Sequence, residues 1–408
     1  MKPAYQEYQA RKILNVHKHV DGWFFDKYSA HPYVGCASGC EFCYSREDKY
    51  RGGRDPDEFD RVIRVKVNAA ELLRRELARQ PVDVLACGDW QLPAERDYAL
   101  LRRMLEVVRD LSFPLFIVER SPLLTRDLDL LSEINRRAWV GVVYSISSLD
   151  TAVKRAFEPR SPAVKLRLAA MAQLAQAGIL VGTALMPVLP VVADDDKHLE
   201  EVIVATREHG GRFVLVGALT MSGPQAARVW GVLDRCFPQA RPTYEQLYAG
   251  RAYGPAGSYS ADLARRVRAL CAKHGLADRM PRWIEPGPRG VNRWLAERLF
   301  NKTYDLELEG ADERRLWAYR RAAWTVDEWP TSLAELYSSQ GLAGLLTLPG
   351  IGERLARLIA GWLEESQMSN VKRQTSNVLS RIKSYRESRI NPCRTASPPV
   401  GACASLLA

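Results

Sequence analysis

The chain has no run of apolar residues that reaches the roughly 18 to 20 positions an α-helix needs to cross a membrane. Its first residues, MKPAYQEYQARK, are polar and lack the apolar core of a signal peptide. Eight cysteines in 408 residues are too sparse for the disulfide framework of a secreted protein. These absences predict a cytoplasmic protein without a membrane partner, in which clustered cysteines serve metal or redox chemistry.

Positive charge is in excess, because Lys and Arg outnumber Asp and Glu and give a formal net charge of +10. Basic side chains that displace counterions gain affinity for a phosphate backbone. The apolar fraction of 47% is ordinary for a folded protein, so disorder throughout the chain is excluded. Composition therefore favours a folded chain of two or three domains with a polyanionic partner.

From about residue 28 to residue 216, apolar β-rich runs alternate with helical patterns, which is typical of successive βα units. Strands are expected at Val82–Cys87, Leu115–Val118, Val140–Ile146, Leu180–Met186 and Phe213–Val216. Helices with apolar residues at three- and four-residue steps are expected at Ala69–Arg79, Ala94–Leu111, Arg126–Arg137, Ala163–Ala177 and Lys197–Glu208. Five or six units indicate an α/β fold with a partial (β/α)6 barrel and not a closed eightfold one.

Beyond Pro224 the pattern becomes mainly helical and rich in arginine, with Pro/Gly breaks between helices. We predict a barrel domain with an N-terminal extension, a helical extension, a smaller all-α domain and a disordered basic tail. Their expected bounds are 1–235, 236–300, 301–366 and 367–408, respectively.

Three cysteines lie within eight positions in the segment HPYVGCASGCEFCY, with the spacing CxxxCxxC at Cys36, Cys40 and Cys43. Thiolates are the ligands that iron–sulfur clusters prefer, and three on one loop can hold a cluster while its fourth iron stays open. The alternative is a structural zinc site completed by His31 or by a distant cysteine. Zinc loops more often use paired CxxC units and no second pair is present, so the pattern favours a cluster.

This motif, with Phe42 directly before the third cysteine and the βα pattern behind it, resembles radical S-adenosylmethionine (SAM) enzymes. The His-Pro-Tyr-x-Gly-Cys lead-in and the Cys43-Tyr44 ending resemble the spore photoproduct lyase-like branch more narrowly. The likeness covers roughly residues 28 to 220. It implies a [4Fe–4S] cluster, SAM on the open iron, a 5′-deoxyadenosyl radical and an electron donor such as flavodoxin or ferredoxin.

The resemblance also implies cofactor contacts at the carboxyl ends of the strands, where βα barrels build their sites. Gly88 and Asp89 correspond to the place that contacts the methionine amine, Arg120 to a residue for the carboxylate, and Ser145 and Ser147 to residues for the ribose. The full set implied as cofactor-binding is Phe42, Tyr44, Gly88, Asp89, Arg120, Ser145, Ser147, Glu158 and Arg160. The alternative for each is an ordinary turn, surface or strand residue.

Cys87, on the second predicted strand, lies at a separation from the cysteine loop similar to that of the hydrogen-donating cysteine of spore photoproduct lyase. The resemblance therefore implies a catalytic thiol that quenches a product radical. A small buried apolar residue is the alternative, since free cysteines most often pack in this way.

Near the C-terminus the segment LLTLPGIGERLA places Gly350, Ile351 and Gly352 between two short helical patterns. Such a turn lets backbone N–H groups point at a phosphate oxygen. The segment resembles the helix-hairpin-helix of DNA repair proteins and, with YRRAA at 319–323 and LAELY at 333–337, the N-terminal domain of family X DNA polymerases. This implies a phosphate-backbone grip by the turn, with Arg354 and Arg357 nearby; protein packing is the alternative.

Together these features predict a lyase-like radical SAM enzyme that acts on DNA and repairs a base flipped out of the duplex. RNA or protein is the alternative substrate. A hypothesis of another class is a DNA-binding protein whose cluster has four protein ligands and is structural or redox-sensing.

Overall fold

The structure is a computed structural model that describes residues 3–365 apart from 52–53, 89, 91–92 and 251–252. The chain divides into two compact units, Met1–Glu328 and Trp329–Ala408. None of the helices in the described part combines the length and the apolarity that crossing a bilayer requires.

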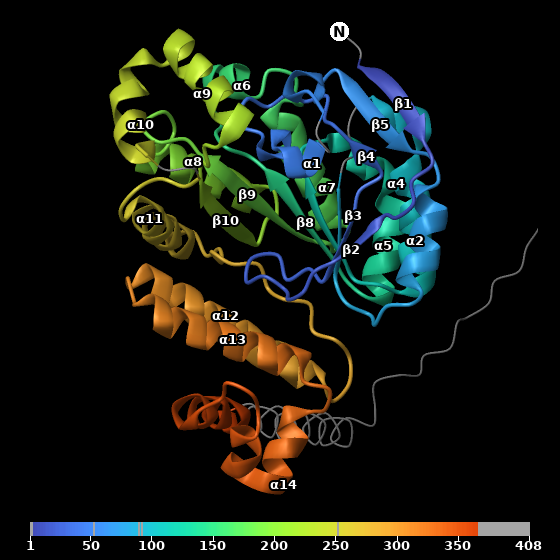
Figure 1. Ribbon diagram of the computed structural model, residues 1–408, viewed down its shortest axis with the longest axis vertical. Helices are drawn as coiled ribbons and strands as arrows, with labels where there is room; N and C mark the ends of the chain where they lie inside the picture. Colours follow the sequence, from blue (N-terminus) through green and yellow to red (C-terminus); the bar gives the residue numbers. More distant parts are fainter. Residues whose placement is uncertain (1–2, 52–53, 89, 91–92, 251–252, 366–408) are drawn as a thin grey trace, which may run out of the picture. The chain divides into compact units, whose positions relative to one another are not determined.

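A seven-stranded sheet forms the centre of the first unit, with the order β10-β9-β8-β7-β6-β3-β2 (Figure 1). Its strands are β2 (Leu14–Val16), β3 (Tyr28–Ala30), β6 (Leu85–Gly88), β7 (Leu115–Glu119), β8 (Val140–Ser145), β9 (Leu180–Val188) and β10 (Phe213–Ala218). The six strands from β3 to β10 are parallel, and each pairs with its predecessor, whereas β2 is antiparallel at the edge. This is the strand order of an open (β/α)6 barrel, as the sequence predicted.

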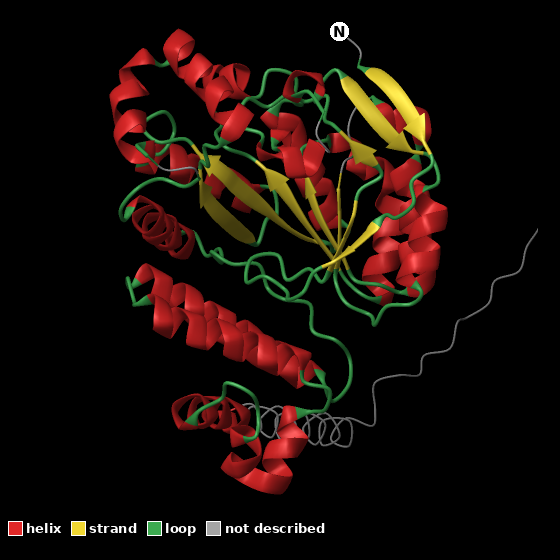
Figure 2. Ribbon diagram, viewed as in Figure 1, coloured by secondary structure: helices red, strands yellow, loops and turns green. Residues whose placement is uncertain are grey.

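Helices connect the parallel strands and cover one face of the sheet (Figure 2). They are α2 (Ala69–Leu77), α3 (Ala94–Tyr98), α4 (Leu100–Leu111), α5 (Leu128–Arg137), α6 (Thr151–Phe157), α7 (Val164–Gln176) and α8 (Asp196–Glu208). After β10 the chain forms α9 (Gly223–Cys236), α10 (Arg241–Tyr248) and α11 (Tyr259–Lys273). The single helix predicted over 94–111 is divided, because Ala99 takes a left-handed conformation with φ +48°.

A second, three-stranded sheet was not predicted. It has the order β1-β5-β4 and consists of β1 (Ala4–Tyr8), β4 (Tyr33–Val34) and β5 (Val62–Lys66). The chain therefore leaves the main sheet after β3, and the cysteines follow the short β4. A single helical turn, α1 (Asp48–Arg51), comes next.

The two faces of the main sheet differ, because successive side chains of a strand point in opposite directions. Ala30, Cys87 and Ile117 are neighbours in register and belong to the core that also contains the apolar faces of the helices. Gly88 and Val118 are in register on the opposite face, which we call the inner face. Val118 is 41% exposed on a central strand, so the inner face borders open space.

Two further helices, α12 (Gly290–Leu308) and α13 (Glu313–Glu328), pack against each other and complete the first unit. On α12, Arg293 is buried and bonds both carboxylate oxygens of Asp327 at 3.1 and 3.0 Å and Asp83 at 2.7 Å. Asp83 lies just before β6, so this cluster ties the helix pair to the barrel. The boundary predicted at residue 301 falls inside α12, and the units divide after Glu328.

The second unit, as far as it is described, contains α14 (Leu333–Leu346) and a helix over residues 353–365. The chain is kinked at Gly341 and turns at Gly350, both with positive φ. Leu345, Leu348 and Ile351 are buried between the helices. The segments YRRAA and LAELY, predicted to belong to one domain, fall in different units, because 319–323 lies on α13 of the first unit. The tail predicted to be disordered, 367–408, lies outside the described residues.

Candidate active site

The loop that carries the three cysteines is held in place by backbone hydrogen bonds to two distant segments. The N–H of Cys36 donates to the carbonyl oxygen of Phe59 at 3.0 Å, and the N–H of Glu41 donates to that of Phe157 at 2.9 Å. The buried ring of Phe42 stacks on Phe157 with 6.2 Å between centroids. The loop is thus fixed to the β4–β5 connection and to the end of α6.

Two glycines allow the loop to follow its path. Gly35 has φ +102°, and a Cβ there would lie 2.7 Å from the carbonyl oxygen of Phe59. Gly39 has φ +58°, and a Cβ there would collide with the guanidinium of Arg160, which in turn pairs with Asp60. Arg160, predicted to contact the cofactor, is therefore placed against the backbone of the cysteine loop.

The three thiols lie on this loop with different exposure: Cys40 is buried, and Cys36 and Cys43 are half-buried. Burial raises the pKa of the Cys40 thiol; Arg120 opposes this shift, while Glu158 and the two other cysteines add to it. Burial therefore opposes deprotonation of Cys40. Among the described residues no three His, Cys, Asp or Glu side chains are already gathered at metal-ligand distances. The donor set still suits an iron–sulfur cluster, which takes thiolate ligands.

Arg120, directly after β7, brings several of the predicted residues together on the inner face. Its guanidinium donates to the Ser145 hydroxyl at 2.8 Å, lies 3.8 Å from the Glu158 carboxylate and packs over the Phe42 ring at 5.6 Å. Burial would lower the pKa of Arg120, but the neighbouring Cys40 and Glu158 groups raise it above its ordinary value. A charged guanidinium therefore faces the thiols.

Arg167, a wholly buried residue of α7 that supports this group, was not found from the sequence. It donates to the carbonyl oxygen of Ser145 at 2.7 Å, to the Ser161 hydroxyl at 2.6 Å and to the Glu158 carboxylate. Burial favours a neutral Glu158, but Arg120 and Arg167 hold the pKa of its carboxyl below the ordinary value. Glu158, predicted to touch the cofactor, is thus an anionic bridge between two arginines.

Glu119, the last residue of β7, is a second residue that the sequence did not reveal. Its buried carboxylate accepts the N–H groups of Trp90 at 2.7 Å, Arg120 at 2.7 Å and Ser121 at 2.8 Å. The fully buried indole of Trp90 donates to Asp127 at 2.8 Å. One carboxylate therefore fixes the loops that follow β6 and β7. The only signal in the sequence was an acidic residue at the end of an apolar strand.

A buried polar network continues from these loops to the strand before the cysteines. The Tyr33 hydroxyl on β4 donates to Glu95 at 2.6 Å, and Arg126 donates to the same carboxylate at 2.7 Å. Arg126 also donates to Asp127 at 2.7 Å, which holds the indole of Trp90. Glu95 has no exposed surface. This network therefore connects β4, which precedes the cysteine loop, to the segments that follow β6 and β7.

The remaining residues expected at the cofactor divide between the inner face and other places. Gly88 ends β6 on the inner face, where a Cβ would lie 3.0 Å from the carbonyl oxygen of Val118. The Ser147 hydroxyl is buried and has no hydrogen-bond partner in the described part of the chain. Tyr44 is 55% exposed beside the cysteine loop. Asp89 lies outside the described residues.

The position of Cys87 does not support the role that the sequence predicted for it. Its thiol is buried in the core between the sheet and the helices, in register with Ala30 and Ile117. Because alternation places it on the face opposite to Gly88, its side chain points away from Arg120 and the inner face. This placement does not support the predicted catalytic role and agrees with the alternative, a small buried apolar residue.

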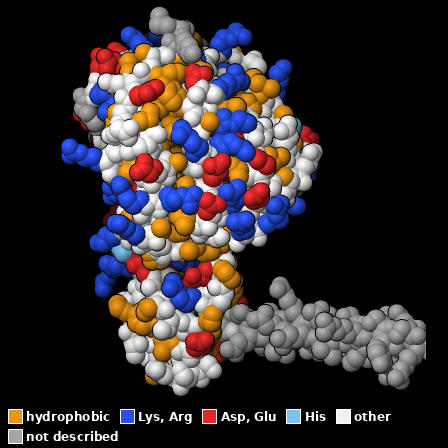
Figure 3. Space-filling view, turned by 90° about the vertical axis from the view of Figure 1, so that its right-hand side faces the viewer, with side chains coloured by type: hydrophobic (Ala, Val, Ile, Leu, Met, Phe, Trp, Pro, Cys, Tyr) orange, Lys and Arg blue, Asp and Glu red, His pale blue; other side chains and the backbone are white. Residues whose placement is uncertain are grey.

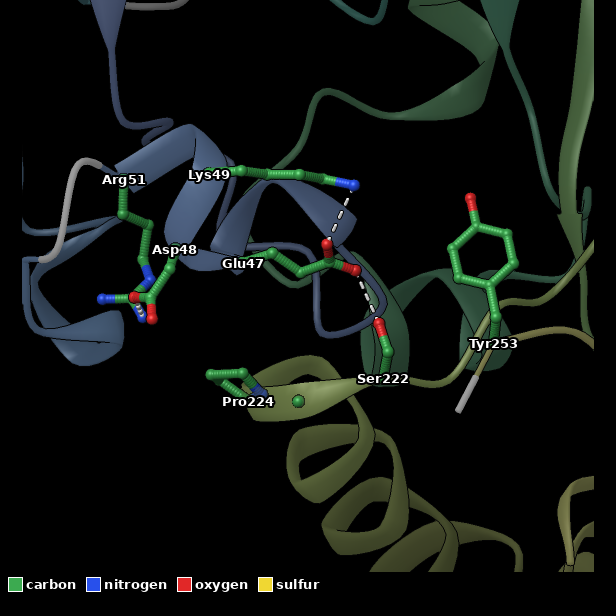
Figure 4. Close-up of a pocket in the computed structure, with 8 residues that line it drawn as sticks. Glu47, Asp48, Lys49, Arg51, Ser222, Pro224 and Tyr253 are labelled. Atoms are coloured by element: carbon green, nitrogen blue, oxygen red, sulfur yellow. Dashed lines mark hydrogen bonds and ion pairs between the residues drawn. The ribbon is translucent and has the colours of Figure 1, made fainter. Parts of the chain in front are cut away.

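A pocket of about 530 Å³ is lined in part by the segment that follows Cys43 along the chain (Figure 4). The Glu47 carboxylate, at its centre, accepts from the Ser222 hydroxyl at 2.6 Å and pairs with Lys49 at 3.1 Å. Its lining residues are Glu47, Asp48, Lys49, Arg51, Ser222, Gly223, Pro224 and Tyr253. The pocket therefore joins the segment after the cysteines to the segment between β10 and α9.

The five residues predicted to grip nucleic acid lie together at the turn of the second unit. Gly350 has φ +75°, and at neither Gly350 nor Gly352 would an added Cβ meet another atom within 4 Å. Arg354 and Arg357 are exposed, but Ile351 is buried, so only its backbone is available to a ligand. Arg357 pairs with Glu353 at 2.5 Å.

Comparison with known proteins agrees with this geometry. The family model "Radical SAM superfamily" matches residues 31–203. Uncharacterised proteins of Mycobacterium tuberculosis (strain H37Rv) and Mycobacterium bovis are 31% identical over 259 residues, which cover 62% of this chain and 75% of theirs. An uncharacterised protein of Methanocaldococcus jannaschii is 27% identical over 170 residues, 41% of this chain and 62% of its own length.

Among solved structures, the cobalamin-dependent SAM radical enzyme OxsB has a TM-score of 0.37 at 10% identity, over 87% of this chain. The chain spans about half of that enzyme's length, 55%. Members of the radical SAM superfamily are SAM-dependent radical enzymes with an iron–sulfur cluster. The chain belongs to the radical SAM superfamily.

Proposed function

We propose that the protein holds a [4Fe–4S] cluster on Cys36, Cys40 and Cys43 and acts on nucleic acid in a lyase-like reaction. When bound, the reduced cluster and SAM supply a 5′-deoxyadenosyl radical. The observation that supports this most is the position of Arg120, a charged guanidinium beside the thiols and backed by Ser145. Electrons are proposed to come from a flavodoxin or ferredoxin.

The residues of the inner face have distinct proposed tasks toward SAM. Arg120 orients the methionine carboxylate by paired hydrogen bonds, because its Nε has no hydrogen-bond partner among the described residues. Gly88 lets the methionine amine approach the backbone, and Asp89 is proposed to bind it. The unpartnered hydroxyl of Ser147 is suited to a ribose hydroxyl. Glu158 then acts through Arg120 and keeps its orientation.

DNA is the proposed substrate, and its support comes from the second unit and from charge. The turn at Gly350 leaves the start of the helix over 353–365 exposed, with Arg354 beside it. Figure 3 shows a face of the first unit on which basic and acidic side chains are interspersed, so this face offers no continuous basic surface. The turn at Gly350, with Arg354 exposed beside it, is the proposed place of contact with DNA.

The radical function is tested by anaerobic reconstitution with iron and sulfide, followed by reduction in the presence of SAM. We expect 5′-deoxyadenosine from the intact protein and none from Cys40→Ala. Cys271→Ala is the matched control, because Cys271 is equally buried but lies on α11, away from the loop. Zinc in the purified protein, or a cluster that yields no 5′-deoxyadenosine, would refute the proposal.

The substrate is tested separately, by binding of duplex, single-stranded and ultraviolet-damaged DNA to the intact chain. Arg357→Glu should weaken binding. It should also reduce the slope of log affinity against log salt concentration by about one for each phosphate contact that is lost. Lys197→Glu, an equal charge change at an 82% exposed site of the first unit, should have a smaller effect. Equal binding by all three proteins would exclude the turn as the interface, and tRNA would then be tested in place of DNA.

A further inference from the structure

A second pocket, of about 410 Å³, lies at the opposite end of the sheet from the cysteine loop. It is lined by Arg212, Arg268, Ala277, Asp278, Arg279, Met280, Pro281, Glu297 and Asn301. Arg212 directly precedes β10, whereas Arg120 directly follows β7 and Ser147 comes two residues after β8, so the two sites occupy different ends of the parallel strands. We propose that this pocket binds a phosphate monoester of about mononucleotide size, independently of the radical reaction.

The guanidinium of Arg279 is the main support for this proposal. It packs against the rings of Trp23 and Tyr304, which are themselves in edge-to-face contact, with 5.0 and 4.4 Å from its central carbon to the ring centroids. No hydrogen bond or ion pair engages its N–H groups within the part of the chain that is described, although the side chain is half-buried. The two rings occupy adjacent sides of the guanidinium and accept none of its N–H groups in a hydrogen bond, and a guanidinium N–H edge suits phosphate.

The charges around the pocket leave a surplus suited to a dianion. Arg268 is balanced, because it pairs with Asp278 at 2.6 Å and with Asp305 at 2.9 Å. Arg212, which is exposed, forms no ion pair with any described residue, as is the case for Arg279. Two guanidinium groups therefore have no carboxylate in direct contact, although Asp278 and Glu307 act on Arg279 from further away, and a phosphate dianion can pair with both.

The carboxylate of Glu297 also lines the pocket and is held by the main chain. It accepts the backbone N–H of Arg282 at 2.9 Å, and burial raises the pKa of its carboxyl above the ordinary value. The neighbouring Asn301 has a buried Oδ1 atom without a partner among the described groups. This acceptor suits a hydroxyl of the ligand, which favours an ester of phosphate over a simple inorganic anion.

The wall of the pocket is fixed by the sheet. The N–H of Ala277 donates to the carbonyl oxygen of Arg212 at 3.1 Å, and the N–H of Val214 donates to that of Ala277 at 2.9 Å. The segment that carries Arg279 thus extends the edge of the sheet beside β10. A pocket of 410 Å³ falls within the usual range for small-molecule sites, so a mononucleotide can enter it without a change of fold.

Calorimetric titration of the full chain with AMP, with adenosine and with inorganic phosphate tests the proposal. We expect AMP to bind, adenosine not to bind, and phosphate to compete with AMP. Arg279→Gln should weaken AMP binding by about tenfold to a hundredfold, because a charge-assisted bond is removed. Arg212→Gln should weaken it by a smaller factor. Arg212 is exposed, so this variant leaves folding intact if Arg279→Gln does not fold.

Arg265→Gln is the matched control, since Arg265 is an exposed arginine on the same helix as Arg268 and does not line the pocket. A 5′-phosphorylated oligonucleotide that binds more tightly than AMP and depends on Arg212 would identify the end of a nucleic-acid strand as the source of the phosphate. The proposal is refuted if AMP and phosphate fail to bind at millimolar concentration, or if the arginine variants bind them as the control does. Cys40→Ala should bind AMP normally, which separates this outcome from failure of the radical function.

Discussion

Replacement of Glu119 by Gln is the sharpest test of how the inner face is held in position. The carboxylate accepts three backbone N–H groups, from Trp90, Arg120 and Ser121, at 2.7 to 2.8 Å. A glutamine of the same shape has one acceptor oxygen and one NH₂ group. If its oxygen takes the two N–H groups of the β7 loop, its NH₂ group faces the N–H of Trp90 and leaves that donor buried without a partner.

The expected cost follows from the hydrogen bonds that the substitution removes. A hydrogen bond to a charged acceptor contributes about 1.5 to 3 kcal/mol, and an orphaned buried donor adds its own desolvation. Glu119→Gln should therefore lower the free energy of unfolding by about 2 to 4 kcal/mol, measured by urea denaturation. Since the loop that carries Arg120 is no longer fixed, the proposed SAM affinity should fall about tenfold while the iron content stays unchanged.

Glu133→Gln provides the control, because Glu133 is 37% exposed and its ion pair with Arg109 is long, at 3.6 Å. Its effect on unfolding should stay within about 0.5 kcal/mol. The reasoning is wrong if Glu119→Gln matches this control in both unfolding and SAM affinity. A loss of stability without a loss of affinity would show that the carboxylate stabilises the fold but does not position Arg120.

Three further predictions concern other parts of the first unit. Asp327→Ala leaves the buried Arg293 without its main partner and should cost about 3 to 5 kcal/mol in urea denaturation; a cost below about 1 kcal/mol would contradict the buried cluster. Cys87→Ala should keep its iron and its yield of 5′-deoxyadenosine, because the thiol faces the helices; loss of the product with iron retained would restore a catalytic role. The hydrogen bond to Asp26 raises the pKa of His17. The stabilisation from this pair is therefore fully present below the unfolded pKa of about 6.5 and is lost as the pH rises through the higher folded pKa. Asp26→Asn should remove this pH dependence of the free energy of unfolding.

The barrel could be predicted from sequence because each strand is a short apolar run between helices of clear periodicity. β8 is buried on both faces, as expected for a central parallel strand, and it begins at the predicted residue. The break at Ala99 had no signal in the sequence, since alanine favours a helix and a left-handed alanine depends on tertiary packing. The boundary after Glu328 was also hidden, because the charged residues of a buried ion cluster such as that of Arg293 look like surface residues in a sequence.

The site was predicted in part, for a related reason. Arg120 directly follows β7 and Ser145 ends β8, so their meeting on one edge of the sheet could be expected from topology. Glu119 and Arg167 could not be found, because a lone charged residue in an apolar strand or in a helix is usually exposed. The role of Cys87 was predicted from its separation from the cysteine loop along the chain. Side chains alternate along a strand, so Cys87 and its neighbour Gly88 had to lie on opposite faces of the sheet.

The residues missed by sequence reasoning share one property that explains the arrangement of the site. Each is a buried charged group whose hydrogen bonds fix main-chain positions: Glu119 holds two loops, Glu95 holds β4 to the loop after β6, and Arg167 holds the end of β8. Side chains of this kind cost free energy to bury and are stable only when all partners are present. The strand ends are therefore rigid before any ligand arrives. In the proposed SAM site, the binding energy that Arg120 and Ser147 provide is then not spent on ordering the loops.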